Sequence, residues 1–389
     1  MITADQILVK QINKAIALNT IYKKKPISRA EIAKVTGLNK STVSALVDEL
    51  LAEELIMETG TGESQGGRKP VHLSINKEVG NIIGIDLGVN YILSVLTNFA
   101  GEIIWERRIS VKKNGNSSLQ RIDDLFQLIE EAIKNAPPSV RGVIGIGIGV
   151  PGIVNYEQGH ILSAPNLCWT DVKLKEIVET RFQVPVFIDN EANAGAIGEK
   201  WFGSGKKATD LLYVSAGTGI GAGIVINNEV YRGSQGLAGE IGHMTVELNG
   251  IACSCGNHGC WEEYASEKAL FRYMQKKTSV ESLSVFDLID LATKGDHAAQ
   301  EGFKYVGKYL GIGVANLINA FNPEIVIIGN TLPLVGDILM DELRKEVGLR
   351  CFASKYYSVK ILSSELNMHA CAMGAAALVI SRLYASPVV

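Results

Sequence analysis

The chain has 389 residues, of which 47% are hydrophobic and 20% charged, and its formal net charge is −3. These values are typical of a soluble protein, and the lack of an apolar run of roughly 18 residues or more excludes a membrane-spanning helix. The length exceeds what one compact core usually holds, so we expect two or three domains. Forty glycines gather in runs such as GIGIGVPG and GTGIGAG, which favours tight strand ends in an α/β protein over low complexity.

Charge is distributed unevenly along this mildly acidic chain. Residues 10–40 contain eight Lys or Arg against a single acid, Glu31. A locally basic end on an acidic protein indicates a nucleic-acid partner.

Capping and turn signals divide the same end into three expected helices. The sequence TADQ has the spacing of a capping box and opens a first helix over about residues 4–22. SRAE at residues 28–31 is a second capping box, and the short helix that follows stops at Gly37. Asn39 then caps a third helix. A helix, a glycine turn and a helix at this spacing predict a helix-turn-helix whose third helix enters a DNA major groove.

The third helix should present small polar residues on the side opposite its apolar stripe. At about 100° per residue, the residues on this outer face or at its flanks are Lys40, Ser41, Thr42, Ser44, Ala45 and Asp48. Short side chains suit base edges and thymine methyl groups, so all of these except Asp48 are predicted DNA contacts. The alternative is an ordinary helical hairpin in a core. The turn, the caps and the basic bias together favour DNA binding.

A hairpin is expected over residues 55–75, where LIMET and VHLSI flank the glycine-rich turn GTGESQGGRKP. This hairpin would be the wing of a winged helix, with Arg68 and Lys69 reaching phosphates or a minor groove. A solvated linker loop is an equally open interpretation. The domain boundary falls near residues 76–80, so the DNA-binding domain is expected to span 1–76.

From residue 81 the pattern changes to that of an α/β protein. IIGIDLG, YILSVLT and EIIWERRI read as strands, followed by a helix over about 119–134 and a buried strand, GVIGIGIG.

Further along, His243 is followed by Cys253, Cys255 and Cys260 in the pattern H-x9-C-x-C-x4-C. One imidazole and three thiolates form a closed set for structural zinc, with no position left for a catalytic water. The alternative is a disulfide. The chain has no signal peptide and only six cysteines, which suits a reducing cytoplasm and favours zinc.

GEIGH followed by CSCGNHGCWE resembles the signature of the ROK family, bacterial sugar kinases and sugar-responsive repressors with an actin/hexokinase-like, ribonuclease H-like fold. The resemblance implies that Glu240 and Glu262 accept hydrogen bonds from sugar hydroxyls. It also implies that His243 ligates zinc through one ring nitrogen and reaches the sugar with the other. Two lobes are expected, one over 77–199 with a C-terminal helix of about 376–389, and one over 200–375 with the zinc site.

Other segments resemble the sugar side of the family. By position, Asn166 and Asn190 would hydrogen-bond sugar hydroxyls, and Glu191 falls where the kinases place the aspartate that deprotonates the attacking hydroxyl. The extra methylene of Glu191 moves its carboxylate by about an ångström. General-base catalysis tolerates such a displacement poorly, but the carboxylate could still accept a hydrogen bond from a hydroxyl.

The phosphate side departs from the family. SAGTGIGAGIV matches the second glycine turn, but DLGVNY stands where the kinases carry D-x-G-G-T-K, and IGNT replaces a glycine-rich strand end. We therefore expect no enzyme activity but a sugar-responsive repressor that binds a palindromic operator as a homodimer. Whole-chain likeness is greatest to repressors that respond to xylose, although no residue named above distinguishes a pentose from a hexose. An active sugar kinase with an accessory DNA-binding end, and an activator, remain alternatives.

Overall fold

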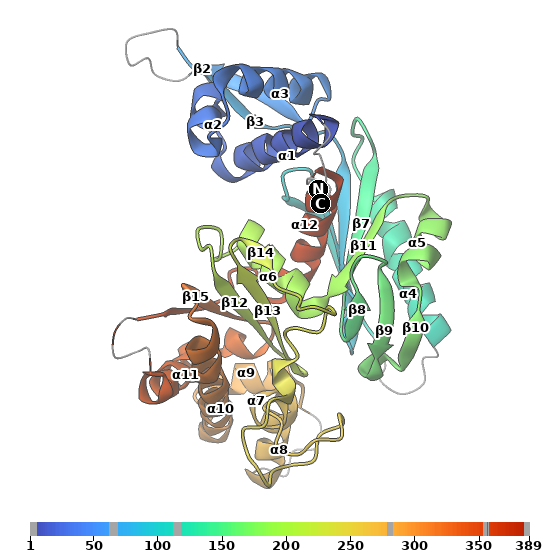
Figure 1. Cartoon of the computed structure of the whole chain (residues 1–389). Coiled ribbons are helices and arrows are strands. Elements are labelled where there is room, and N and C mark those ends of the chain that lie inside the picture. Colours follow the sequence, from blue (N-terminus) through green and yellow to red (C-terminus); the bar gives the residue numbers. More distant parts are fainter. Residues whose placement is uncertain are drawn as a thin grey trace.

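The computed structural model describes residues 6–61, 69–111, 118–277, 283–352, 356 and 358–384. The chain forms a small N-terminal domain at one end of a two-lobed α/β body (Figure 1). Among the described residues, no helix is long and apolar enough to span a membrane.

The N-terminal domain packs helices α1 (Gln6–Lys24), α2 (Arg29–Thr36) and α3 (Lys40–Ala52) against a small antiparallel sheet. Its strand order is β1 (Ile27–Ser28), β3 (Val71–Ile75), β2 (Ile56–Thr61). The apolar side of α3 is buried at Val43, Leu46, Val47 and Leu50. This is the predicted winged helix-turn-helix.

Local capping produces the turn between α2 and α3 as the sequence predicts. Ser28 and Glu31 form a reciprocal capping box, and Gly37 ends α2 with a φ of 72°. The Asn39 side chain accepts a hydrogen bond from the Thr42 backbone N–H at the start of α3.

Helix α1 differs from the prediction at its end. It continues two residues beyond residue 22 and stops at Lys24, directly before Lys25–Pro26. A residue that precedes proline disfavours helical backbone, so the proline sets this boundary. Thr3, the first residue of the expected capping box, lies outside the described residues.

The first lobe is built on a mixed sheet with the strand order β11-β7-β4-β5-β6. Its strands are β4 (Asn81–Asp86), β5 (Tyr91–Asn98), β6 (Ile103–Ser110), β7 (Val143–Val150) and β11 (Val186–Asn190). Helices α4 (Ser118–Lys134) and α5 (Leu174–Phe182) pack on this sheet. A smaller antiparallel sheet contains β8 (Ile153–Asn155), β9 (His160–Ala164) and β10 (Trp169–Val172). The strands and the helix predicted between residues 81 and 150 are therefore confirmed.

The second lobe repeats this plan with the strand order β14-β13-β12-β15-β16. Its strands are β12 (Leu211–Ala216), β13 (Ile220–Ile226), β14 (Glu229–Val230), β15 (Ile325–Gly329) and β16 (Lys360–Ser363). Its helices are α7 (Glu262–Ala265), α8 (Glu267–Lys277), α9 (Val285–Thr293), α10 (His297–Phe321) and α11 (Asp337–Arg350).

Two helices, α6 (Glu191–Trp201) and α12 (Ala370–Tyr384), cross between the lobes. Helix α6 packs on β12 and β13 of the second lobe, whereas α12 packs on β4 and β7 of the first. The crossing is tight, because a Cβ built on Gly374 would lie 1.6 Å from the Ala194 carbonyl oxygen. The expected lobe boundaries at residues 199 and 376 fall inside these helices.

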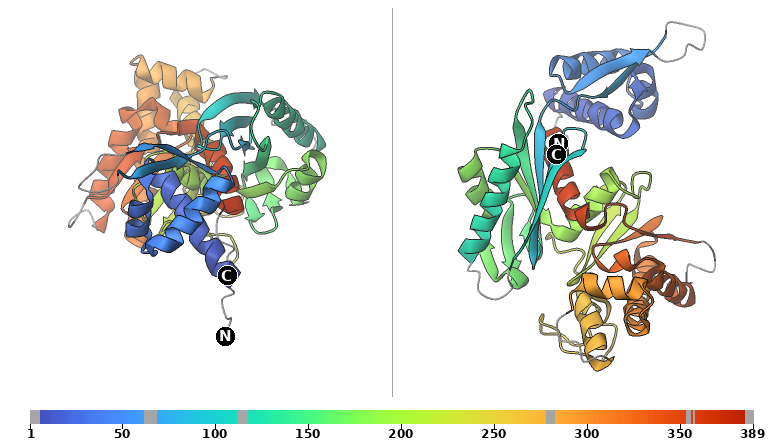
Figure 2. Two further views of the ribbon diagram at one scale, coloured as in Figure 1. Left: turned by 90° about the horizontal axis from the view of Figure 1, so that it is seen from above. Right: turned by 180° about the vertical axis from the view of Figure 1, so that it is seen from behind.

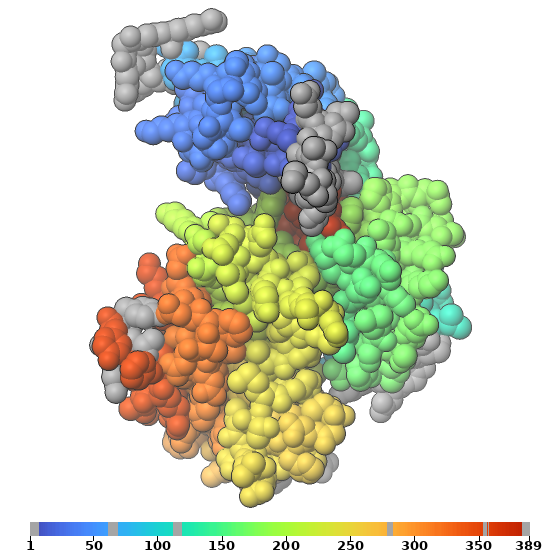
Figure 3. Space-filling view, viewed as in Figure 1, coloured from blue at the N-terminus to red at the C-terminus, as the bar shows by residue number. Residues whose placement is uncertain are grey.

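The N-terminal domain is packed onto the first lobe. One apolar core combines residues of α1, α2 and α3 with first-lobe residues that include Val79, Ile82 and Phe99, and with Val379 and Ile380 of α12. Figure 2 shows the light-blue segment that leaves the domain after β3 and continues into β4 of the first-lobe sheet. In the space-filling view the domain, in blue, lies at the end of the molecule opposite the yellow α8 region (Figure 3).

Candidate functional site

The outer face of α3 is accessible in the structure. Lys40, Ser41 and Ala45 are exposed, and Thr42 and Ser44 are partly exposed. Asp48, on the same face, pairs with Arg29 of α2 at 2.7 Å. This ion pair spans the two helices of the helix-turn-helix, and we did not predict it. In the wing, Lys69 is exposed, and Arg68 lies outside the described residues.

The predicted metal ligands meet on one side of the second lobe. Ligand atoms of His243, Cys253, Cys255 and Cys260 all lie within 4.8 Å of one another. The His243 Nδ1 is 3.7 Å from the Cys253 Sγ, and the Cys255 Sγ is 3.6 Å from the Cys260 Sγ. Tetrahedral zinc with ordinary bond lengths requires about 3.6 Å between nitrogen and sulfur ligands and about 3.8 Å between two sulfurs. The side chains therefore fit a closed tetrahedral metal site, with Nδ1 as the histidine ligand.

The predicted carboxylates adjoin this cluster. Glu262 is 7% exposed at the start of α7, and its Oε1 lies 4.0 Å from the Cys253 Sγ. Its charge is balanced by Lys268 at 3.3 Å, a residue that sequence reasoning missed. Glu240 is exposed in the turn before the 3-10 helix that ends at His243. Residues 240–262, called the metal loop below, thus carry both carboxylates and His243, whose Nε2 is not needed as a metal ligand.

Glu191 faces this loop from the first turn of α6. It lines a small polar pocket between the lobes together with Asp86, Tyr213, Ser215, Asn330, Asn367, Met368 and Cys371. Burial raises the pKa of Glu191 to about 8, and the negative charges of Asp86, Glu240 and Glu262 act in the same direction. Glu191 is therefore mostly protonated near neutral pH. A protonated carboxyl can donate a hydrogen bond as well as accept one, which suits a hydroxyl but not a general base.

The two predicted asparagines are placed differently. The Asn190 side chain caps α6 by accepting from the Ala192 and Asn193 backbone N–H groups, and its Nδ2 donates to the Gly152 carbonyl at 2.9 Å. One Nδ2 hydrogen is left for a ligand. Asn166 is exposed in the 3-10 turn between β9 and β10, and the described contacts do not join it to the carboxylates.

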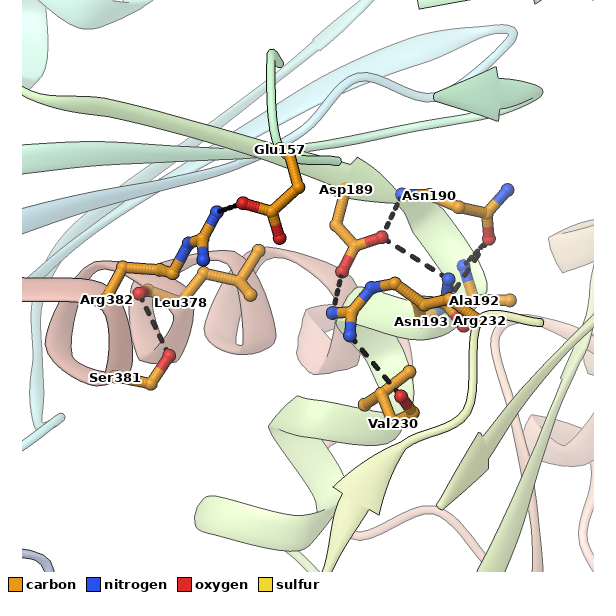
Figure 4. Close-up of polar contacts among 10 residues, drawn as sticks. All are labelled: Glu157, Asp189, Asn190, Ala192, Asn193, Val230, Arg232, Leu378, Ser381 and Arg382. Atoms are coloured by element: carbon orange, nitrogen blue, oxygen red, sulfur yellow. Dashed lines mark hydrogen bonds and ion pairs between the residues drawn. The ribbon is translucent and has the colours of Figure 1, made fainter. Parts of the chain in front are cut away.

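A network of ion pairs beside Asn190 crosses between the lobes, and it was not predicted from the sequence. Arg232, which follows β14, reaches Asp189 at the end of β11 with a 2.5 Å ion pair. Figure 4 shows Asp189 between Arg232 and Asn193, with Arg382 bound separately to Glu157. The two arginines also stack on the Tyr156 ring, at 3.7 and 4.4 Å from its centre. The second lobe is thus held to the first beside the sugar-side residues.

The turn at residues 86–91 stands where the kinases have their first phosphate turn, and the Tyr91 side chain covers it. Tyr91, which stands at the position of the kinase lysine, donates to the Asp86 carboxylate at 2.7 Å. Its ring covers the turn so closely that a Cβ on Gly88 would lie 2.7 Å from it. Arg108 stacks on the outer face of the ring at 4.2 Å.

The second phosphate turn is covered in the same way. A Cβ on Gly217 would lie 2.8 Å from the side-chain amide of Asn330, which donates to the Ser215 hydroxyl at 3.1 Å. Asn330 belongs to the IGNT segment that departs from the kinase pattern. Side chains therefore lie directly against a glycine in each of the two turns that resemble the phosphate turns of the kinases.

The fold and the site define a class of protein: a DNA-binding regulator whose body is built like a sugar kinase but lacks open phosphate turns. Residues 82–382 match the model of the ROK family, and residues 11–65 match that of the MarR family. The chain belongs to the ROK family.

Relatives that match nearly the whole chain include proteins named as repressors. The chain is 46% identical to the xylose repressor of Caldicellulosiruptor bescii, with 98% of each chain covered, and 44% identical to that of Bacillus subtilis, with 97% of each covered. A solved ROK-family transcriptional regulator, a homologue of the E. coli MLC protein, superposes with a TM-score of 0.82 at 30% identity over 97% of each chain. A ROK glucokinase from Streptomyces griseus, solved with glucose and AMPPNP, covers 77% of this chain and 99% of its own, with a TM-score of 0.71 and 30% identity.

Proposed function

We propose that this ROK-family repressor binds a palindromic operator as a homodimer and leaves it when a sugar, D-xylose, binds between its lobes. Operator DNA as a partner places this activity in the cytoplasm. The observation that carries the proposal is the contrast within the cleft between the lobes. The carboxyl groups of Glu191, Glu240 and Glu262 lie close enough for their charges to act on one another, beside the predicted metal ligands, while Tyr91 and Asn330 lie against glycines of the two turns.

On the sugar side, carboxyl groups meet from two elements. Glu191 comes from α6, and Glu240 and Glu262 come from the metal loop. A polyol needs several acceptors at fixed positions, because each buried hydroxyl must be satisfied. The Nε2 of His243 would supply a donor whose direction is fixed by the metal on Nδ1.

The metal is proposed to be zinc, held by His243, Cys253, Cys255 and Cys260. The soft thiolate set and the tetrahedral separations support zinc over oxygen-preferring cations. With four protein ligands the ion would be structural, and it would fix the loop between Glu240 and Glu262.

The DNA site is proposed to be the outer face of α3, with Lys40, Ser41, Thr42, Ser44 and Ala45 entering a major groove. Arg68 and Lys69 of the wing would contact the backbone or a minor groove. A twofold dimer would place two such helices about one DNA turn apart, or a multiple of it, which matches a palindrome.

Xylose is proposed from the names of the relatives that match the whole chain. The sugar can release DNA only if it binds one lobe arrangement more tightly than the other. We infer that the arrangement favoured by sugar no longer fits the half-site spacing.

A gel-shift titration of the operator with a panel of aldoses tests the function. D-xylose should release the operator at lower concentration than the hexoses, and failure of every aldose would contradict the proposal. A coupled assay of sugar-dependent ATP turnover tests the kinase alternative, for which we expect no turnover above background.

A further inference from the structure

Helix α6 connects the pocket between the lobes with the DNA-binding domain. Its first residue, Glu191, lines the pocket between the lobes. Its last residue, Trp201, and the following Phe202 lie against Tyr22 of α1, with ring centres 5.1 and 6.3 Å apart from that of Tyr22. An eleven-residue helix is about 16 Å long, so one rigid element spans the whole distance.

The carboxyl end of α6 is anchored to the second lobe. Glu199 is completely buried there, and its carboxylate accepts hydrogen bonds from the Ser364 hydroxyl and, at 3.2 Å, from the Leu366 backbone N–H. Both partners follow β16, the edge strand of the second-lobe sheet. Lys200 donates to the Ala208 carbonyl, just before β12. This end of the helix is therefore tied to the second lobe, whereas the middle of the helix crosses α12, which packs on the first lobe.

The DNA-binding domain is packed mainly on the first lobe. Its apolar core runs without interruption into Val79, Ile82 and Phe99 of that lobe. Tyr22 is only 6% exposed, and its hydroxyl has no hydrogen-bond partner among the described residues. The Tyr22 ring therefore contributes packing alone to its contact with Trp201 and Phe202.

Two elements of different lobes thus meet at this aromatic contact. A rotation of the lobes would displace Trp201 and Phe202 relative to the surface that carries Tyr22. Phe202 also rests on the first-lobe turn at Gly101, where an added Cβ would lie 2.2 Å from its ring. Close packing on both sides leaves little room for gradual deformation, so the contact should exchange between discrete arrangements.

We propose that Tyr22, Trp201 and Phe202 form the contact through which the lobe arrangement set by sugar is transmitted to the DNA-binding domain. They are positioning residues that touch neither sugar nor DNA. The inference rests on the proposed function, because it requires that a sugar releases the operator.

The test is a thermodynamic cycle on the full-length dimer. Operator affinity is measured by fluorescence anisotropy with and without saturating D-xylose, and xylose affinity is measured by calorimetry. Allosteric coupling typically changes affinity roughly 5- to 150-fold. Trp201→Ala should reduce this factor to below about threefold. Its affinity for operator alone and its affinity for sugar alone should be nearly unchanged.

Conservative variants separate transmission from folding. Trp201→Phe and Tyr22→Phe retain an aromatic ring at the contact, and Tyr22→Phe removes a hydroxyl that has no described partner, so both should keep the coupling factor. Phe182→Ala removes half of a similar edge-to-face pair with Phe126 on the first lobe and should also keep it. If Trp201→Ala fails to fold, Phe202→Leu replaces it, with the same expected loss.

Each outcome decides the proposal. Unchanged coupling in a folded Trp201→Ala protein overturns the proposed transmission and leaves the repressor function intact. If the Trp201→Ala protein fails to bind operator in the absence of sugar, the proposal is also overturned, because the contact would then be only structural. If the parent protein is not released by any aldose, the proposed function fails together with this inference.

Discussion

The two sides of the cleft between the lobes have diverged. On the proposed sugar side, Glu262 is buried, and its contacts among the described residues, with Lys268 at 3.3 Å and with the Cys253 Sγ at 4.0 Å, both use Oε1. Its Oε2 remains as an acceptor for a ligand. On the phosphate side, Tyr91 and Asn330 lie against the turns and donate hydrogen bonds to Asp86 at 2.7 Å and to Ser215 at 3.1 Å. In the proposed function, sugar recognition is kept on one side while side chains lie against Gly88 and Gly217 on the other.

The largest effect is expected from the predicted metal ligands, because the proposed metal would fix the loop that carries Glu240 and Glu262. Cys255→Ser should destabilise the second lobe by several kcal/mol and abolish the sugar response, since apparent binding free energies of structural zinc are about 10 to 16 kcal/mol. Metal analysis with thermal unfolding checks this. A metal-free, stable protein that binds sugar normally would contradict it.

Truncation of a sugar-side carboxylate should have the next largest effect. Glu262→Ala is expected to leave operator affinity intact and weaken sugar binding by about 1 to 3 kcal/mol, the cost of one unpaired buried partner. The result would be a repressor that sugar no longer releases. Operator titration with and without sugar measures it, with Glu247→Ala, an exposed carboxylate on the same loop, as the control.

On the phosphate side, Tyr91→Phe should destabilise the folded protein by about 1 to 3 kcal/mol, because buried Asp86 loses a donor. The other oxygen of Asp86 already has no partner among the described residues. Sugar binding should change little, which would show that the two sides are separable. Denaturant unfolding is compared with that of Tyr231→Phe, whose ring is exposed. Equal free energies of unfolding of the two variants would mean that the hydrogen bond from the Tyr91 hydroxyl to Asp86 does not stabilise the folded protein.

Glu191 gives a pH test. Its pKa is about 8 in the folded protein against an ordinary 4.5, so between these values the folded protein holds a proton that the unfolded chain has released. Stability contributed by this proton is present at and below pH 4.5 and is lost as the pH rises to 8. Glu191→Gln should flatten that decline, whereas exposed Glu229→Gln should not. Denaturant unfolding across this pH range is the measurement, and an unchanged slope would exclude the assignment.

The smallest effect concerns DNA. Lys40→Ala should weaken binding to operator and to random DNA alike, and lower the salt slope by about 1, since one phosphate contact is lost. Ser41→Ala should instead change which operator bases are preferred. Lys276→Ala, exposed on α8, changes the net charge equally and should leave both quantities unchanged. A Lys40 variant with the parent salt slope would show that this side chain makes no phosphate contact.

Sequence reasoning succeeded where the determinants are local. The Ser28 and Asn39 caps and the spacing of the metal ligands each lie within a short stretch, so their geometry follows from spacing. It failed for contacts between distant residues, such as the Asp189–Arg232 pair between the lobes. Replacement of the kinase motif at Tyr91 was visible in the sequence, but nothing in the sequence showed that its ring would cover Gly88.

Helix α12 illustrates the same limit. The sequence analysis placed its start at about residue 376, but the helix begins at Ala370, because its run of small apolar residues has weak periodicity. Its crossing with α6 was not predicted, since it joins residues far apart in the chain. The aromatic contact of Tyr22 with Trp201 also joins residues far apart in the chain.

The contrast between the two sides of the cleft is tested most directly by calorimetry of one protein preparation with D-xylose and with Mg-ATP. The account predicts saturable binding of D-xylose, lost in Glu262→Ala, and no binding of Mg-ATP with or without the sugar. Saturable Mg-ATP binding, or the absence of sugar binding in protein with full metal content, would contradict it.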